Sequence, residues 1–438
     1  MNKLAIALLA SSILTSLPTK AESPLQADIN ADYPHLEKLF KHLHSNPELS
    51  FQETETSKRL AAELKALGYS VSTGVGKTGV VAVMKNGKGP TVLIRADMDA
   101  LPLQEKSGLA YASTKTQVNL DGVEMPVMHA CGHDMHVTAL VGTAKQMATR
   151  KDQWQGTLVL IGQPAEEAYG GAQAMLDDGL YSKFPTPDYA LALHVGSADV
   201  AGKIYYRAGT MYSSADSVEI IVPGIGTHGA APQYGKDPIV IGAQIVTALQ
   251  TLITRDISPL EAGIVTVGTF HAGTAGNIIP DQATMALTVR ANSDEVRETL
   301  LTGIERIAKN MGRAAGLPED KLPYMVHKGG YEVTKNDASL TTRLDSTFKE
   351  KFGADRIVAY EQHNMAAEDF TDFTRTPENV PGFYFMVGGT PAEAFEAAKN
   401  GGPAIPGHHS PVFKIAPEPS IKTGVEAMTI AALELLEK

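Results

Sequence analysis

The chain has 438 residues, of which 43% are hydrophobic and 20% are charged. This composition is typical of a globular protein, and the length allows more than one domain. The formal net charge of -11, without any run of basic residues, argues against nucleic acid as a partner.

The first 21 residues have the pattern of a secretory signal peptide. A basic start at Lys3 precedes an apolar stretch over residues 4–17, and the small residues Thr19 and Ala21 fit a cleavage site. The stretch is too short to span a membrane comfortably. Because no later segment is apolar enough to span one, we expect a secreted or periplasmic protein with no membrane partner after cleavage.

Two local patterns follow the signal. Ser50-Phe-Gln-Glu53 is predicted to be a capping box that opens a helix running to about Leu67. Gly74-Val-Gly-Lys-Thr-Gly79 partly matches two phosphate-binding patterns. We reject both, because a strand rather than a helix follows and because a P-loop needs glycine at the position of Val71. The segment is predicted to be a turn between strands.

Three continuously apolar runs are predicted to be buried parallel strands, and each is followed by side chains able to do chemistry. The runs and the residues that follow them are 91–95 with Asp97 and Asp99, 158–161 with Glu166 and Glu167, and 189–193 with His194. Open α/β sheets bind their ligands at the carboxyl ends of such strands. These side chains are therefore expected to meet in one crevice.

A motif rich in histidine lies between the first two runs. His129-Ala-Cys-Gly-His-Asp-Met-His136 precedes an apolar helical pattern and contains Cys131, the only cysteine of the chain. A lone thiol in an oxidising compartment is exposed to oxidation unless it is buried or bound to metal. Thiolate, imidazole and carboxylate together suit zinc or another borderline divalent ion better than calcium or magnesium.

The pattern changes after Arg207. Strands and helices over residues 217–328 are predicted in the order βαββαβ, which makes a complete small two-layer domain. Helices predicted at 337–352 and 427–436 return to the large sheet. We therefore assign residues 211–329 to an inserted domain, and residues 22–210 and 330–438 to a discontinuous catalytic domain.

Eight stretches, in order along nearly the whole mature chain, resemble those of M20-type metallopeptidases, in the amidohydrolase branch with hippurate hydrolases and indole-acetyl-amino-acid hydrolases. The stretches are Arg95-Ala-Asp-Met-Asp-Ala-Leu-Pro102, His129-Ala-Cys-Gly-His-Asp-Met-His136, Gln163-Pro-Ala-Glu-Glu167, Leu193-His-Val195, Thr227-His-Gly-Ala-Ala-Pro232, Gly276-Asn-Ile-Ile-Pro-Asp281, Glu368-Asp-Phe370 and His409-Ser-Pro411. The resemblance implies an α/β fold: a zinc-peptidase-like catalytic domain with a central, mostly parallel sheet, plus an inserted α+β, ferredoxin-like lid or dimerisation domain.

The resemblance also implies a centre of two divalent metal ions, with zinc expected and manganese, nickel or cobalt as alternatives. It assigns five ligands: Cys131, His133, Glu167, His194 and His409. The residues alone leave other readings open, since His194 also fits a core histidine, Cys131 a small buried hydrophobe, and His408 is an alternative to His409.

Other residues receive roles around this centre. Glu166 is expected to be the general base, although a solvated acidic pair is the plain alternative for Glu166 and Glu167. Asp99 is expected to orient a ligand. Asp97 is expected to do little more than finish its strand, and His136 to be structural.

The inserted domain supplies three further candidates. By resemblance, His228 stabilises the oxyanion, with a trans arrangement across a dimer as one option, and Asn277 holds substrate. Arg290 ends a strand and is expected to bind a substrate carboxylate, with an ordinary surface ion pair as the alternative.

The sequence thus predicts hydrolysis of the amide bond of N-acyl amino acids, such as hippurate, to a carboxylic acid and an amino acid. The alternatives are a dipeptidase or carboxypeptidase of the same family, acting on short peptides, and a secreted binding protein that keeps the fold without the reaction. A zinc nucleobase deaminase is rejected, since it needs a Pro-Cys-x-x-Cys motif that a chain with one cysteine cannot supply. A homodimer formed through the inserted domain is also expected.

Overall fold

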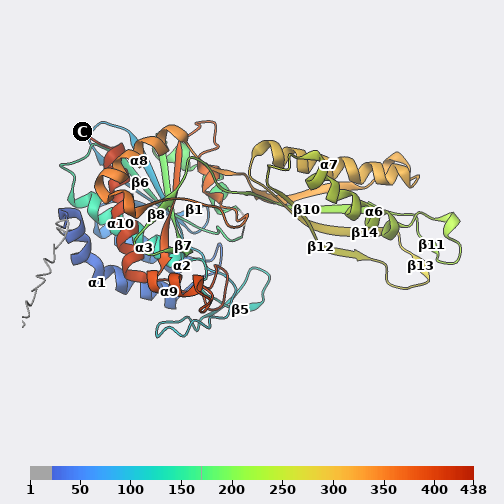
Figure 1. Cartoon of the computed structure of the whole chain (residues 1–438), viewed down its shortest axis with the longest axis horizontal. Coiled ribbons are helices and arrows are strands. Elements are labelled where there is room, and N and C mark those ends of the chain that lie inside the picture. Colours follow the sequence, from blue (N-terminus) through green and yellow to red (C-terminus); the bar gives the residue numbers. More distant parts are fainter. Residues whose placement is uncertain (1–21, 169) are drawn as a thin grey trace, which may run out of the picture.

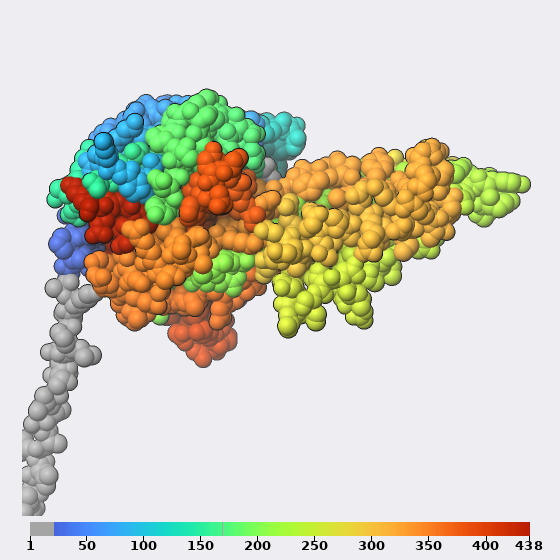
Figure 2. Space-filling model, turned by 90° about the horizontal axis from the view of Figure 1, so that it is seen from above, coloured from blue at the N-terminus to red at the C-terminus, as the bar shows by residue number. Residues whose placement is uncertain are grey.

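The computed structural model describes residues 22–168 and 170–438. A larger body carries a narrower arm that projects from one side of it (Figures 1 and 2). The predicted signal peptide lies outside the described residues. The fold class is α/β, as predicted, and the larger body is a large mixed sheet covered by helices.

Among the described residues, the larger body holds ten of the named strands, two of which form a small separate hairpin, and eight of the named α-helices, with two more strands at its junction with the arm. Its elements are α1 (Pro24–Ser45), α2 (Thr54–Ala66), β1 (Ser70–Val75), β2 (Gly79–Asn86), β3 (Thr91–Asp97), β4 (Thr116–Val118), β5 (Glu124–Pro126), α3 (His133–Thr149), β6 (Gly156–Gln163), α4 (Gly171–Asp177), α5 (Leu180–Lys183), β7 (Tyr189–Val200), β8 (Ile204–Tyr206), α8 (Ala338–Phe352), β17 (Ile357–Ala359), β18 (Gly382–Thr390), α9 (Ala392–Lys399) and α10 (Pro417–Leu435), with β9 (Gly209–Tyr212) and β16 (Thr334–Asn336) at the junction with the arm.

The eight-stranded sheet has the order β1-β2-β6-β3-β7-β18-β8-β17. Its centre, β6-β3-β7-β18, is parallel. These strands are apolar on both faces because helices α1, α3 and α10 pack on one side, while α4 and the 3-10 segment Asp369–Phe373 pack on the other. The carboxyl ends of β3, β6 and β7 therefore open at one edge of the sheet.

The arm begins with β10 (Ser214–Pro223) and continues through the elements α6 (Pro238–Thr251), β12 (Gly263–Ala272), β14 (Gln282–Ala291), α7 (Asp294–Ala314) and β15 (Tyr324–Tyr331). Its antiparallel sheet has the order β12-β14-β10-β15, which is the ferredoxin-like arrangement. Both helices pack on one face around a separate apolar core. At the far end of the arm, β11 (Thr227–His228) pairs with β13 (Ile278–Ile279) (Figure 1).

The predicted capping box at Ser50 is wrong. Helix α2 begins at Thr54, after an N-cap residue, Glu53, whose side chain makes no capping hydrogen bond. The Ser50 hydroxyl instead donates to Asp99 at 2.6 Å, and the Glu53 carboxylate accepts the amide of Ala165 at 2.8 Å. Tertiary hydrogen bonds took the polar groups that the local pattern assigned to a helix end.

Two other expectations need correction. Helix α10 starts at Pro417, ten residues before the predicted start at Ala427, and α1 was not predicted at all. The segment Pro238–Asp256, α6 with its continuation, is long and apolar enough to cross a membrane by length and composition, although no later span was expected. Its apolar residues Ile241, Ile245 and Leu249 pack into the core of the arm, so its length and composition are weak evidence for a membrane span. The turn predicted between residues 74 and 79 joins β1 to β2 as expected.

Candidate metal centre

The predicted active side chains come together at the carboxyl edge of the central sheet. Asp97 ends β3, His194 lies within β7, and His133 opens α3. Glu166 and Glu167 follow β6 in a short loop. Because these strands pair in parallel, the residues lie at corresponding positions near the same edge of the sheet. Asp97 is paired with Gln163 on the neighbouring strand, and His194 is paired with Met386.

The five side chains predicted as ligands form two overlapping groups. Cys131, His133 and His194 make one group, and Cys131, Glu167 and His409 make the other. Within each group the donor atoms lie within 4.8 Å of one another. Cys131 Sγ is 3.4 Å from His194 Nε2, and His409 Nε2 is 3.2 Å from Glu167 Oε1. The arrangement offers two neighbouring cation positions that share the thiol.

Hydrogen bonds to carbonyl groups fix which nitrogen of two histidines is free. His133 Nδ1 lies 2.8 Å from the carbonyl oxygen of Asp99, and His194 Nδ1 lies 2.8 Å from that of Val195. A carbonyl only accepts, so each Nδ1 carries the proton and each Nε2 keeps its lone pair. This is the tautomer that a metal-binding histidine needs.

The two adjacent histidines near the C-terminus, His408 and His409, make different contacts. His408 Nε2 donates to the carbonyl oxygen of Val195 at 2.8 Å, so this nitrogen is already used. His409 has a left-handed backbone (φ 60°), which turns it toward Glu167. Of the two, only His409 belongs to a group of potential metal ligands in the described chain, and its role as a ligand stays a prediction.

Asp99 holds the loop and a ligand at the same time. Its Oδ1 accepts the amide of Glu166 at 3.1 Å, and its Oδ2 accepts the amide of Glu167 at 3.0 Å. Its carboxylate also lies 3.3 Å from His133 Nδ1. These contacts are those of an orienting residue, the role expected for Asp99.

A buried ionic network below the cluster was not foreseen. Arg95 is fully buried and contacts the carboxylates of Asp97 at 2.7 Å, Glu368 at 2.6 Å and Asp369 at 2.9 Å. Burial alone would raise the pKa of Asp97, but Arg95 and two histidines hold it well below its usual range. Asp97 also binds His136 Nδ1 at 2.6 Å. Asp97 thus does more than finish a strand, and the Glu368-Asp-Phe370 stretch was the available signal for its acidic partners.

Glu166 lies between the metal-ligand groups and this network. A carboxylate oxygen of Glu166 lies within 4.8 Å of ligand atoms of His133 and Glu167 in one group, and of the carboxylate oxygens of Glu368 and Asp369 in another. Burial, followed by the charges of Glu368 and Glu167, raises its pKa well above the usual value. Such a carboxylate is suited to hold and release a proton, which is what a general base requires.

The side chains of the cluster fit divalent cations. The buried atom His133 Nε2 has no hydrogen-bond partner in the described part of the chain, and Glu167 Oε1 makes only ion-pair contacts, at 3.2 Å to His409 Nε2 and 3.9 Å to His133 Nε2. Burial, with Glu167 and Glu166 nearby, raises the pKa of the Cys131 thiol well above its usual range. Positive charge at this place would relieve the crowded carboxylates and allow a thiolate. Orphaned donors, thiol and imidazole together match a borderline metal such as zinc.

A cavity of about 570 Å³ lies over the cluster, within the size range of ligand pockets. Its floor contains Cys131, Glu166 and His409, and one wall comes from strands β12 and β14 of the arm. Arg290, on that wall, donates to the carbonyl oxygen of Met365 at 3.3 Å. Arg290 thus lines the same cavity as the predicted centre.

His228 and Asn277 are not brought to the cluster within one chain. Both are exposed in the paired segment at the far end of the arm, away from the central sheet (Figure 1). His228 Nδ1 accepts the amide of Ala230 at 3.0 Å.

Residues 93–428 match the Peptidase family M20/M25/M40. Over 339 residues, the chain is 40% identical to the hippurate hydrolase of Campylobacter jejuni, covering 77% of this chain and 84% of that protein. Over 368 residues, it is 35% identical to thermostable carboxypeptidase 2 of Saccharolobus solfataricus, covering 83% and 88%. Among solved structures, a dinuclear metal-binding peptidase of the M20 family from Bacillus subtilis superposes with a TM-score of 0.75 at 29% identity, covering 93% and 99%.

Proposed function

This chain belongs to the Peptidase family M20/M25/M40 and is a hydrolase, and we propose that it cleaves the amide bond of N-acyl amino acids to give a carboxylic acid and a free amino acid. One observation carries the proposal. Glu166 lies at the floor of a cavity of about 570 Å³, beside two groups of predicted ligands, while Arg290 lies on the wall above. A base, a metal centre and a carboxylate-binding group are thus within reach of one small substrate.

We assign the metal-binding role to Cys131, His133, Glu167, His194 and His409. Two divalent cations held by these side chains, zinc being our first choice, supply Lewis acidity toward a carbonyl oxygen and toward water. The protein contributes fixed geometry, because Asp99 and the carbonyl of Val195 orient the imidazoles.

Glu166 provides the proton transfer. Its carboxylate accepts a proton from the attacking water as the water oxygen bonds to the amide carbon. The same proton then passes to the leaving nitrogen as the C–N bond breaks, so that acid and amine leave and Glu166 is restored. Transfer of this kind contributes about 10²- to 10⁴-fold in rate.

Arg290 would bind the carboxylate of the amino-acid part. A guanidinium forms charge-assisted, bidentate hydrogen bonds with such a group. Ile264, Thr266 and Thr288 line the same wall and would contact the remainder of the substrate. A carboxypeptidase or dipeptidase is the second candidate, because of the similarity to the carboxypeptidase of Saccharolobus solfataricus.

The test combines metal analysis with a panel of substrates. Wild type and Glu166→Ala are assayed on hippurate, on other N-acyl amino acids and on simple dipeptides, with Glu55→Ala on the exposed surface as control. We expect about two metal ions per chain in all three proteins, and a loss of at least ~10²-fold in kcat/KM for Glu166→Ala alone. Wild-type turnover by Glu166→Ala would remove this residue from the mechanism, and a preference for dipeptides would favour the second candidate.

We also propose a homodimer in which each arm serves the partner's metal centre. Strand β12 forms an edge of the arm's sheet, and the exposed residues Ile239 and Val240 lie on α6 beside it. Such an edge pairs readily with a second copy. His228 and Asn277 would then reach the partner's cavity, with His228 as an oxyanion donor.

Mixing two inactive variants tests this arrangement. Glu166→Ala chains lack the base, and His228→Ala chains lack the proposed donor. If His228 acts in trans, a mixed dimer contains one complete site and regains up to about half of the activity per site of the wild type. No recovery after verified subunit exchange would place His228 outside the partner's site.

We further propose that the chain is exported from the cytoplasm and that residues 1–21 are removed on export. The support is the charged start, apolar stretch and small residues of that segment. Mass spectrometry of the exported protein should find a new N-terminus at Glu22. Retention of the full chain in the cytoplasm would contradict the proposal.

A further inference from the structure

Tyr331 reaches from the arm into the catalytic body. It is the last residue of β15, and pairing with Ala215 of β10 ties its backbone to the arm's sheet. Its hydroxyl donates to the main-chain carbonyl oxygen of Glu166 at 2.5 Å. Its side chain is buried, with the residue 4% exposed. The arm therefore touches the backbone of the residue assigned as general base.

The loop that carries Glu166 is held from several directions. Asp99 binds the amides of Glu166 and Glu167 from the sheet side, and Glu53 accepts the amide of Ala165. Ala165 itself has a left-handed backbone (φ 51°), which is unfavourable for a residue with a side chain and must be held in place by such contacts. Tyr331 completes the set from the opposite domain.

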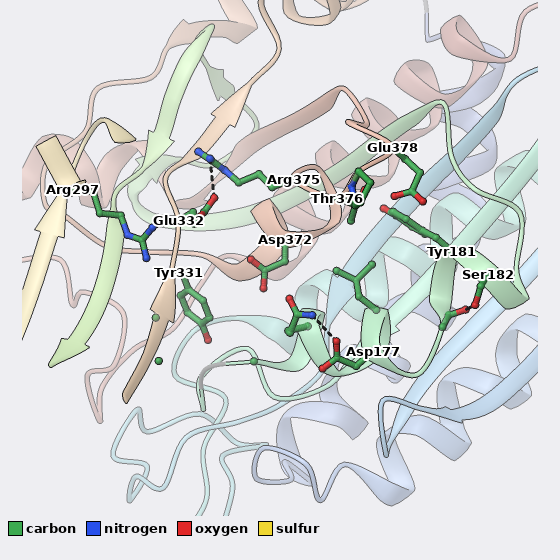
Figure 3. Close-up of a pocket in the computed structure, with 17 residues that line it drawn as sticks. Asp177, Tyr181, Ser182, Arg297, Tyr331, Glu332, Asp372, Arg375, Thr376 and Glu378 are labelled. Carbon is green, nitrogen blue, oxygen red and sulfur yellow. Dashed lines mark hydrogen bonds and ion pairs between the residues drawn. The ribbon is translucent and has the colours of Figure 1, made fainter. Parts of the chain in front are cut away.

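The position of Tyr331 depends on how the arm sits on the body. The next residue, Glu332, contacts Arg375 of the body at 2.8 Å and Arg297 of α7 at 3.4 Å. Arg375 also contacts Asp294 at the start of α7, at 2.9 Å. Figure 3 shows Tyr331 near Arg297, Glu332 and Arg375 at the junction.

Tyr331 lies between two cavities. One is the cavity over the predicted metal centre, and the other has a volume of about 810 Å³ and is lined by the junction residues drawn in Figure 3. Gly329 and Gly330 precede Tyr331 in this wall, and Gly329 has a φ of 129° that other residues rarely adopt. The side chain of Tyr331 is therefore buried at the junction of body and arm, with its hydroxyl directed to the loop that carries Glu166.

We propose that Tyr331 is a positioning residue through which the arm holds Glu166 in place for proton transfer. The inference rests on the proposed function of Glu166. Because the Tyr331 hydroxyl contacts the main chain of Glu166, its loss acts first on the geometry of the base, while the metal content reports whether the neighbouring ligand Glu167 is disturbed as well. A base displaced by about 1 Å can cost on the order of 10²-fold in rate.

The test compares Tyr331→Phe with Tyr181→Phe. Tyr181 lines the larger cavity, and its hydroxyl donates to the carbonyl oxygen of Phe373 at 2.6 Å, so its removal matches the chemical change without touching the loop. For Tyr331→Phe we expect kcat to fall by about 10- to 100-fold, KM to change by less than about three-fold and metal content to stay at the wild-type value. Tyr181→Phe should keep kcat within about two-fold.

Amide hydrogen exchange gives a second readout that needs no substrate. Peptides covering residues 158–168 should exchange faster in Tyr331→Phe than in wild type or Tyr181→Phe, because the loop loses one of its holding contacts. Unchanged exchange together with unchanged kcat overturns the inference. If wild type itself hydrolyses none of the substrates, the proposed function fails, and the exchange result still decides whether Tyr331 holds the loop.

Discussion

His44 is a buried histidine held between two carboxylates, and we predict that it makes stability depend on pH. It lies on α1, with Nδ1 at 2.7 Å from Asp134 of α3 and Nε2 at 3.1 Å from Glu105. The side chain is 3% exposed. Burial alone would lower its pKa, but the hydrogen bonds to Asp134 and Glu105 raise the pKa to about 9 from the ordinary 6.5.

The size and sign of the effect follow from that difference in pKa. The folded protein keeps the proton on His44 more tightly than the unfolded chain does. At ~1.36 kcal/mol for each pKa unit, charged His44 contributes about 3 kcal/mol to the free energy of unfolding. This contribution is complete below about pH 6.5, declines as the pH rises, and is lost above about pH 9.

Urea unfolding of wild type and His44→Gln between pH 6 and 10 measures this contribution. The difference in unfolding free energy between the two proteins should shrink by about 3 kcal/mol across that range, because only the wild type loses a charged histidine. His42→Gln, on the exposed face of the same helix, is the control and should follow the wild type. Parallel curves for wild type and His44→Gln would refute the reasoning.

Three further predictions concern the centre and its support. Arg95→Met should lower the free energy of unfolding by about 3–5 kcal/mol in urea titrations, because it leaves buried carboxylates without their cation. The control Arg343→Met removes a partly exposed ion pair with Glu434 and should cost at most about 1 kcal/mol. Equal losses in the two variants would show that the buried network contributes no more to stability than a surface ion pair. Arg290→Gln should raise KM about 10- to 100-fold for N-acyl amino acids but leave KM for the corresponding N-acyl amino-acid amides nearly unchanged, and a similar rise for both would contradict a carboxylate contact. Removal of metal by a chelator should abolish hydrolysis and lower the melting temperature, and added zinc or manganese should restore both. Full activity in protein that metal analysis shows to be metal-free would refute the metal assignment.

The gathering of Asp99, Glu167 and His194 could be predicted because strand geometry leaves a pattern in the sequence. Continuous apolar runs indicate buried parallel strands, and the carboxyl ends of such strands share one edge of the sheet. The polar residue that follows each run is therefore placed by the chain direction alone. The βαββαβ order of the arm was readable for the same reason, since periodicity identifies its elements one by one.

Contacts between distant segments left no such pattern. Arg95 meets Glu368 across 273 positions of the chain, and Tyr331 meets Glu166 across 165. Neither pair belongs to a periodic element that would signal its partner. The failed capping box has the same cause, because Ser50 fits a local motif yet donates its hydroxyl to Asp99, 49 positions away. Local rules describe what a residue can do, and tertiary packing decides which option it takes.

The residues assigned to metal binding and two of the residues proposed to act in turnover come from different domains. The five assigned ligands all come from the body, where a rigid sheet and the α3 terminus position them. Tyr331 and Arg290 come from the arm, one against the backbone of the base and the other on the wall of the cavity. A change in the seating of the arm should therefore alter kcat and KM while metal affinity stays constant. Under the proposed function, the arm would control whether a loaded centre acts, because it contacts the backbone of Glu166 and forms one wall of the cavity, while the five assigned ligands lie in the body.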